Sequence, residues 1–156
     1  MSMEPPTQAL LLLAYQQSAR DLEHAIRSGG HVALRPKHGA VFGQLARRGT
    51  RATVLARGAG MTKAAMGELV DELQELGYVK RERDPSDRRA KLVLPTAAGL
   101  DVLRILNEFN DHWEKRHRKL LGRDAYQSLR SSLLSIASPA SGKGRAAAPA
   151  ARQTRA

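Results

Sequence analysis

The fold of this chain is decided by residues 55–96, LARGAGMTKAAMGELVDELQELGYVKRERDPSDRRAKLVLPT. Gly58-Ala59-Gly60 separates one helical segment from the next, and Thr62 is a good N-cap for a helix over Lys63–Leu76. Gly77 then ends that helix as a C′ glycine. The apolar positions of this second helix have the spacing of one helical face: Met66, Leu69, Val70 and Leu73.

The short turn between the two helices suits a steep crossing. Such a crossing needs a small residue where the helices meet and a residue that tolerates positive φ in the turn. Ala56 and Gly60 meet these two needs. The segment therefore favours a helix-turn-helix, with a plain helical hairpin as the alternative.

After Gly77 the pattern changes from the helical period to that of strands. We predict strands at Tyr78–Arg83 and Lys91–Leu94. Asp84–Asp87 is a turn by its chemistry, because proline presets φ and the Asp and Ser side chains bond back to the backbone. The sequence thus predicts a hairpin whose tip is Asp84–Ala90.

Outside this stretch, apolar periodicity predicts further helices, and their caps are visible. Thr7 and Thr96 are candidate N-caps, Pro36 suits the first turn of a helix, and Gly49 is a stop signal. The predicted helices are Gln8–Ser28, Lys37–Arg47, Ala52–Arg57, Ala97–Leu121 and Asp124–Ala137. The resulting order of four helices, a hairpin and two helices is that of a winged helix-turn-helix. The fold class is mainly α with a small β-hairpin.

The terminal helices carry apolar stripes that a winged domain of some sixty residues cannot cover. Exposed stripes of that size usually mark association, and symmetric pairing would place two recognition helices about 34 Å apart, one turn of duplex. We therefore expect a homodimer, with a monomer containing a folded-back bundle as the alternative. The expected division is residues 1–34 and 97–138 for dimerisation, 35–96 for DNA binding, and 139–156 as a disordered basic tail.

Composition limits the classes of function. The formal net charge of the 156 residues is +11, which favours a polyanionic partner because neutralising phosphates releases counterions. The absence of cysteine excludes disulfides, zinc thiolate sites and thiol redox sensing. The apolar run Ala9–Tyr15 is too short for a membrane span and follows no basic segment, so we expect a cytoplasmic protein without a membrane partner.

The start of the helix over Lys63–Leu76 has the features of a recognition surface. N-terminal residues of such helices face base edges in the major groove. Small residues let the backbone lie deep in the groove, and an alanine methyl group can contact the thymine methyl. The candidate contacts are Thr62, Lys63, Ala64, Ala65, Gly67 and Glu68. Gly67 costs roughly 1 kcal/mol of helix stability, which close approach to DNA or helix packing would explain, and Glu68 could accept from cytosine or be merely solvated.

The hairpin carries a second set of candidate contacts. A basic tip can reach the minor groove, where an inserted arginine meets enhanced negative potential. Asp84 or Asp87 can brace one guanidinium and reduce the ordering cost of binding. An exposed charged turn without function is the alternative. The candidates here and nearby are Arg83, Asp87, Arg88, Arg89, Lys37, His38 and Arg51.

Three motifs resemble those of the MarR-type winged-helix regulators, over roughly residues 8–137. They are LARGAGMT (55–62), LVDELQELGYVKR (69–81) and DPSDRRAKLVLPTAAG (84–99), of which the last is the most specific. The resemblance implies a homodimer formed by the terminal helices on a pseudopalindromic double-stranded DNA site. It also implies a wing arginine in the minor groove, at Arg88 or Arg89. Small anionic or phenolic ligands would bind between the dimerisation and DNA-binding regions.

The remaining residues give no sign of chemistry. No two of the five histidines are four residues apart, and no nucleophile elbow, phosphate loop or dinucleotide fingerprint occurs, so we expect no metal, no cofactor and no enzyme activity. A pocket between helices needs aromatic walls and a polar anchor. The candidates for a small aromatic or anionic effector are Tyr15, Arg20, Phe42 and Trp113.

The sequence as a whole predicts a sequence-specific dimeric DNA-binding regulator, a repressor that a small ligand could release. Because Ala64, Ala65 and Gly67 offer few hydrogen bonds, we expect specificity to depend on DNA shape and on paired geometry. The alternative is a winged-helix module for nonspecific nucleoid binding or protein contact.

Overall fold

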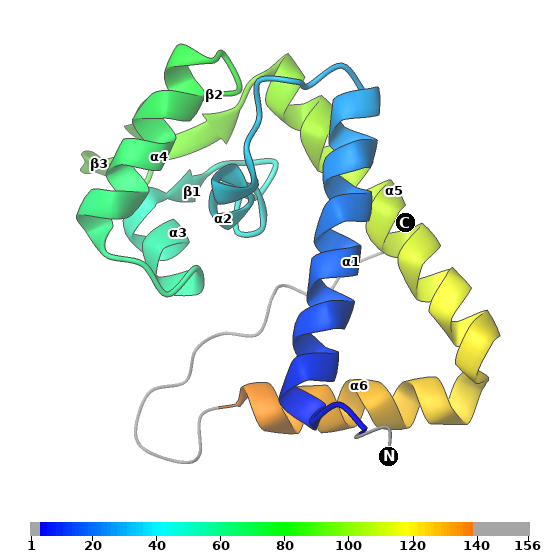
Figure 1. Cartoon of the computed structure of the whole chain (residues 1–156). Helices are drawn as coiled ribbons and strands as arrows, with labels where there is room; N and C mark the ends of the chain where they lie inside the picture. The colour runs from blue at the N-terminus through cyan, green and yellow to red at the C-terminus, as the bar shows by residue number, and fades with distance from the viewer. Residues whose placement is uncertain (1–3, 139–156) are drawn as a thin grey trace, which may run out of the picture. The chain divides into compact units, whose positions relative to one another are not determined.

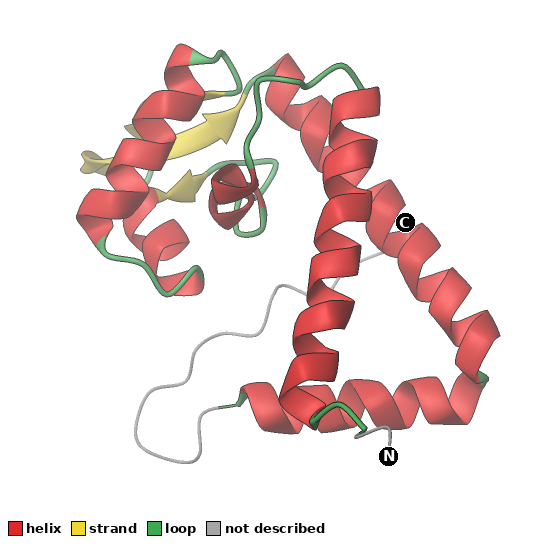
Figure 2. Cartoon of the chain, in the orientation of Figure 1, coloured by secondary structure: helices red, strands yellow, loops and turns green. Residues whose placement is uncertain are grey.

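The computed structural model describes residues 4–138, so the expected basic tail at 139–156 lies outside the described residues (Figure 1). The helices are α1 (Thr7–Ser28), the 3-10 helix η1 (Pro36–His38), α2 (Gly39–Phe42), α3 (Ala52–Gly58), α4 (Lys63–Glu75), α5 (Ala97–Leu121) and α6 (Arg123–Ala137). The strands are β1 (Thr50–Arg51), β2 (Val79–Asp84) and β3 (Asp87–Pro95) (Figure 2). The chain forms two compact units that divide after Leu106, within α5.

The core of the first unit lies between α2, α3, α4 and the sheet. The predicted apolar face of α4 is confirmed, since Met66, Val70 and Leu73 are fully buried. The other buried apolar residues of this core are Leu34, Val41, Phe42, Leu45, Leu55, Ala56, Leu69, Tyr78, Val79, Val93, Val102 and Leu103. This packing fixes which side of α4 remains for the solvent.

The sheet has three antiparallel strands in the order β1-β3-β2. The sequence did not predict β1, which is only two residues long and pairs Thr50 with Val93. The predicted hairpin tip of Asp84–Ala90 is wrong, because the ladder continues to the pair Asp84 and Asp87. Ser86 closes this short turn by donating to the Asp84 carboxylate from both its backbone nitrogen and its hydroxyl.

The helix between residues 37 and 47 is also shorter than predicted. Pro36 begins η1 as expected, but α2 ends at Phe42 and Gly49 ends no helix. Beyond α2 the backbone turns toward β1, where Ala46 N donates to the Thr50 hydroxyl over 3.0 Å. The side chain of a residue in the following strand thus replaces a helical partner.

Of the two threonine caps predicted for the long helices, one is confirmed. The Thr96 hydroxyl accepts from Gly99 N and donates to Gly77 O, so it joins the start of α5 to the end of α4. Thr7 is instead the first residue of α1, and Pro6 precedes it as a cap without a side-chain bond.

A buried histidine connects three segments of the first unit. His31 Nε2 lies 3.0 Å from Asp101 Oδ2 on α5, and Nδ1 lies 3.2 Å from the Tyr78 hydroxyl before β2. Gly99 allows α5 to start close by, since a Cβ there would lie 2.1 Å from Tyr78 O. The loop after α1, the hairpin and α5 are thereby held together.

The second unit contains the end of α5 and all of α6. The Arg118 guanidinium lies 5.9 Å above the ring of Tyr126, which is the buried residue of α6, and Arg130 pairs with Glu114. Among residues 4–138, no helix has the length and apolar character required to cross a bilayer.

Candidate nucleic-acid interface and adjoining cavity

The N-terminal turn of α4 leaves a polar and small-residue surface open to solvent. The Thr62 hydroxyl accepts from Ala65 N over 3.2 Å, which confirms the predicted cap. Thr62, Lys63, Ala64 and Glu68 are exposed, whereas Ala65 and Gly67 are half-buried.

Packing among the described residues 4–138 does not require a glycine at position 67. A Cβ at this position would meet no heavy atom within 4 Å, apart from the backbone of its own helix and its neighbours. The structure therefore gives no support to helix packing as the reason for this glycine. The remaining explanation is that Gly67 lets another backbone, that of DNA, approach α4 closely.

One side of α4 faces a cavity rather than the open solvent. Ala65, Glu68, Leu69 and Glu72 have helical spacing and all line this cavity. Ala65 and Glu68, two of the six expected contacts on this helix, thus belong to a second surface as well.

A buried carboxylate fixes the base of the wing. Asp84 is 5% exposed, and its Oδ2 accepts from Arg51 Nε over 2.7 Å and lies 2.6 Å from Arg51 Nη2. Its Oδ1 accepts from Ser86 over 2.8 Å at the backbone nitrogen and 2.6 Å at the hydroxyl. The hydrogen bonds from Ser86, and then from Arg51, lower the pKa of Asp84 to about 2.

Among the described side chains, the hairpin carboxylates hold the guanidinium of Arg51, from β1. The sequence had suggested an arginine of the tip as the partner of Asp84 or Asp87. Asp87 Oδ2 lies 3.7 Å from Arg51 Nη2, and its Oδ1 accepts from Arg89 N. The side chains of Arg83 and Arg89 are exposed, whereas that of Arg88 lies outside the described part of the structure.

A further arginine ties the hairpin stem to α4. Arg81 on β2 pairs with Asp71 and donates to Gly67 O over 3.5 Å. The sequence shows the charge of Arg81 and its position six residues after the end of α4, but not its contact with that helix.

His38, an expected DNA contact, is only 1% exposed. Its Nδ1 accepts from Arg35 N over 3.0 Å, so the proton of the neutral ring lies on Nε2. This burial argues against direct contact with a duplex. Lys37, in contrast, is exposed, and its Nζ lies 2.6 Å from Glu72 Oε2.

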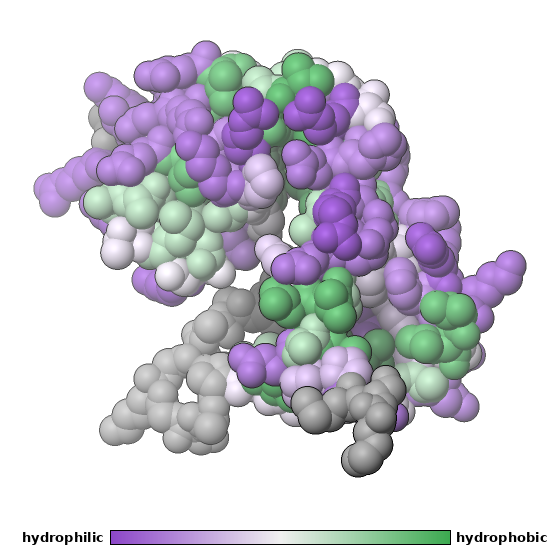
Figure 3. All heavy atoms as spheres, in the orientation of Figure 1, coloured by the Kyte–Doolittle hydropathy of each residue, from purple (hydrophilic) through white to green (hydrophobic). Residues whose placement is uncertain are grey.

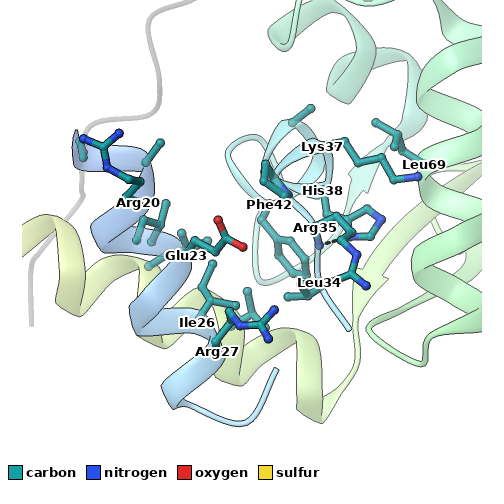
Figure 4. A pocket seen from close by; sticks show the side chains of 18 of the residues that line it. Arg20, Glu23, Ile26, Arg27, Leu34, Arg35, Lys37, His38, Phe42 and Leu69 are labelled. Carbon is teal, nitrogen blue, oxygen red and sulfur yellow. Dashed lines mark hydrogen bonds between the residues drawn. The ribbon is translucent and has the colours of Figure 1, made fainter. Parts of the chain in front are cut away.

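The cavity beside α4 has a volume of about 1200 Å³ and lies within the first unit (Figure 4). Tyr15, Arg20 and Phe42, three of the expected ligand contacts, line it. Figure 4 shows Glu23 and Arg27 of α1 on one wall, with Phe42 and Leu34 facing them. Trp113, the fourth expected ligand contact, does not line the cavity. It lies in the second unit and stacks on His117 with ring centroids 3.6 Å apart.

No group of three or more His, Cys, Asp or Glu side chains within residues 4–138 is arranged to hold a metal ion. The steep helix pair, the capped α4 and the two-stranded wing define the class as a winged helix-turn-helix protein.

Comparison with known proteins specifies this class further. Residues 34–90 match the model of the MarR family. The HTH-type transcriptional regulator YcgE of Bacillus subtilis (strain 168) is 38% identical over 58 residues, which are 35% of this chain and 38% of YcgE. The transcriptional regulator HosA of Escherichia coli O111:H- is 36% identical over 55 residues, 35% of this chain and 41% of HosA. The chain therefore matches about two fifths of the length of these curated relatives.

Solved structures extend the similarity over most of the chain. CouR from Rhodococcus jostii RHA1 bound to p-coumaroyl-CoA has a TM-score of 0.67 and 27% identity, over 86% of this chain and 93% of CouR. The S. aureus MepR-DNA complex has a TM-score of 0.68 at 15% identity, over 85% and 96% of the two chains. Its likeness concerns the fold. Residues 34–90 thus match the MarR family model, and the fold of the chain is similar to those of CouR and MepR.

Proposed function

We propose that this protein is a dimeric, sequence-specific DNA-binding transcription regulator, a repressor that a small ligand releases. The observation that carries this proposal is the exposed start of α4 beside a wing whose base is held by Asp84 and Arg51. The names of the relatives support it, since YcgE and HosA are both transcriptional regulators. Action on DNA would place the protein in the cytoplasm, and nothing about the site suggests an enzyme.

In this proposal α4 enters the major groove and the hairpin follows the adjacent minor groove. Lys63 is the one strong donor at the exposed start of α4, while Ala64 and Gly67 permit a close approach to the bases. Arg88 or Arg89 of the wing would enter the minor groove, and Arg51 on β1 holds the base of the wing through Asp84. In this proposal the buried His38 does not contact DNA.

The dimer would form through the terminal helices. Figure 3 shows hydrophobic residues on the surface at the N-terminal half of α1, where Leu12 and Leu13 are more than half exposed. On α6, Leu133 is 37% and Ile136 is 64% exposed. Exposed apolar side chains grouped on one helix are typical of an association surface.

The cavity beside α4 would hold the effector. Phe42, Leu34 and Ile26 offer an apolar wall, and Arg20, Arg27 and Arg35 offer cationic groups. This combination fits an aromatic anion, and CouR, whose fold is similar, has been solved with p-coumaroyl-CoA. Because the cavity is lined by α4, a ligand there could change the placement of the recognition surface.

The decisive experiment is selection of bound duplexes from a random pool. We expect enrichment of a pseudopalindrome whose half-sites are about 10 base pairs apart, centre to centre. Arg89→Ala should then reduce the affinity for the selected duplex by about 1–3 kcal/mol, and by more than the matched stem variant Lys91→Ala. A pool without any enriched palindrome would instead indicate nonspecific nucleoid binding or protein contact.

A further inference from the structure

A single carboxylate oxygen connects η1 to the recognition helix at the wall of the cavity. Glu72 Oε2 on α4 lies 2.6 Å from Lys37 Nζ and 3.3 Å from His38 Nε2. The pKa of Glu72 is lowered, first by the hydrogen bond from Lys37 and also by the nearby ring of His38. Glu72 therefore pairs with Lys37 and lies close to His38, two residues of η1.

The contact with His38 is incomplete. Nδ1 of this ring is already an acceptor for Arg35 N, so Nε2 carries the proton and needs an acceptor. Nε2 is buried, and although Glu72 is near, no hydrogen bond of proper alignment is formed. A buried donor without an aligned acceptor is the kind of group that a ligand oxygen can satisfy.

The cationic side chains that line the cavity favour an incoming anion. The cavity is lined by Arg20, Arg27, Arg35 and Lys37, against Glu23, Glu68 and Glu72. Glu72 is 38% exposed at its side chain, so it can leave Lys37 for the solvent at small cost. The same cavity provides Phe42 and Leu34 for an apolar body.

We propose that the anionic group of an aromatic ligand, a carboxylate or phosphate, displaces the Glu72 carboxylate from Lys37 and His38. The exchange gives His38 Nε2 an aligned acceptor and breaks the ion pair that ties α4 to η1. This inference rests on the proposed function, because it describes how the cavity regulates α4. Glu72 is then a positioning residue, which contacts no DNA and acts through the placement of its helix.

The exchange predicts two separate effects of Glu72→Gln, one on ligand affinity and one on the coupling between ligand and DNA. If Glu72 competes with the ligand, Glu72→Gln removes the competitor and leaves the donors free. Ligand binding without DNA should become tighter, whereas the influence of the ligand on DNA affinity should be lost. A carboxylate that merely stabilised the fold would not produce both effects. Because coupling between two sites is reciprocal, DNA should also lose its influence on ligand affinity in this variant.

Benzoate and its neutral analogue benzamide are suitable probes, titrated calorimetrically into the full chain at constant ionic strength. We expect benzoate to bind Glu72→Gln at least about fivefold more tightly than wild type, and benzamide to show no such gain. Glu75→Gln, the same change three residues further along α4, is the matched control and should behave as wild type. Lys37 has an exposed side chain, and Lys37→Met should weaken benzoate binding both in wild type and in Glu72→Gln.

Equal or weaker benzoate binding by Glu72→Gln would overturn the proposal, and so would equal gains for benzoate and benzamide. The duplex titration then follows with wild type, where benzoate should weaken DNA binding, and with Glu72→Gln, where it should not. If no selected duplex binds even wild type, the proposed function fails. The benzoate titrations without DNA still decide whether the exchange occurs.

Discussion

At the scale of single residues, a substitution at Gly67 should change stability and DNA affinity in opposite directions. A Cβ there has open space, so Gly67→Ala should raise the free energy of unfolding by about 0.5–1 kcal/mol through better helix propensity. If the bare backbone approaches the bases, the same variant should bind the selected duplex several-fold more weakly. Urea unfolding and a duplex titration measure the two quantities. Unchanged DNA affinity would mean that Gly67 has no role in close approach.

Gly99 provides the opposite case on another helix. Its Cβ would lie 2.1 Å from Tyr78 O, a backbone atom that cannot rotate away. Gly99→Ala should therefore lower the free energy of unfolding by about 1–3 kcal/mol, as overpacking does. A gain in stability, measured by the same urea titration, would contradict the close packing of α5 on the residue before β2.

At the scale of elements, the Asp84 carboxylate makes the attachment of the wing dependent on pH. Its pKa of about 2 in the folded chain lies below the value of about 3.9 in an unfolded one. The carboxylate thus stabilises the fold above the unfolded pKa, and this contribution is lost as pH falls through the folded pKa. Asp84→Asn should be less stable than wild type at pH 7 and should lose less stability toward pH 2. Unfolding midpoints at a series of pH values test this.

Asp84 is not the only carboxylate that makes the stability of wild type and of Asp84→Asn fall in acid. The pKa values of Glu72 and Asp101 are also lowered, by their bonds from Lys37 and Arg104 respectively, so the variant keeps part of the acid sensitivity. Equal slopes for wild type and Asp84→Asn between about pH 4 and 2 would show that Asp84 is not held in this way. The matched stem variant Glu82→Gln should retain the full slope.

Elements with strong local signals could be predicted from the sequence, whereas long-range pairing could not. The cap at Thr62 and the apolar face of α4 follow from nearby residues, and the structure has both. The strand β1 is two residues long and exists because β3 lies beside it. For the same reason, no local pattern predicts that Asp84 holds Arg51, which is 33 residues away.

The candidate site shows the same limit. Its exposed residues on α4 were predictable from helical spacing, but the burial of His38 was not, because it depends on how η1 packs against α4. Side chains of the cavity come from α1, η1, α2, α4 and α5, and only Tyr15, Arg20 and Phe42 were expected from the sequence to contact a ligand. The contacts of Glu72 are visible only in three dimensions.

At the scale of the whole molecule, the proposed dimer should determine both mass and salt dependence. Tyr126, Leu129, Leu133 and Ile136 have helical spacing on α6, and Leu133→Glu would place a charge on that face. We expect the sedimentation mass to fall to that of a monomer. Because each monomer would neutralise about half of the phosphates, the slope of log K against log salt should also fall by about half. Ser131→Glu, on the opposite face of α6, should leave both quantities unchanged, and a Leu133→Glu variant that remains dimeric would exclude this face of α6 from the interface.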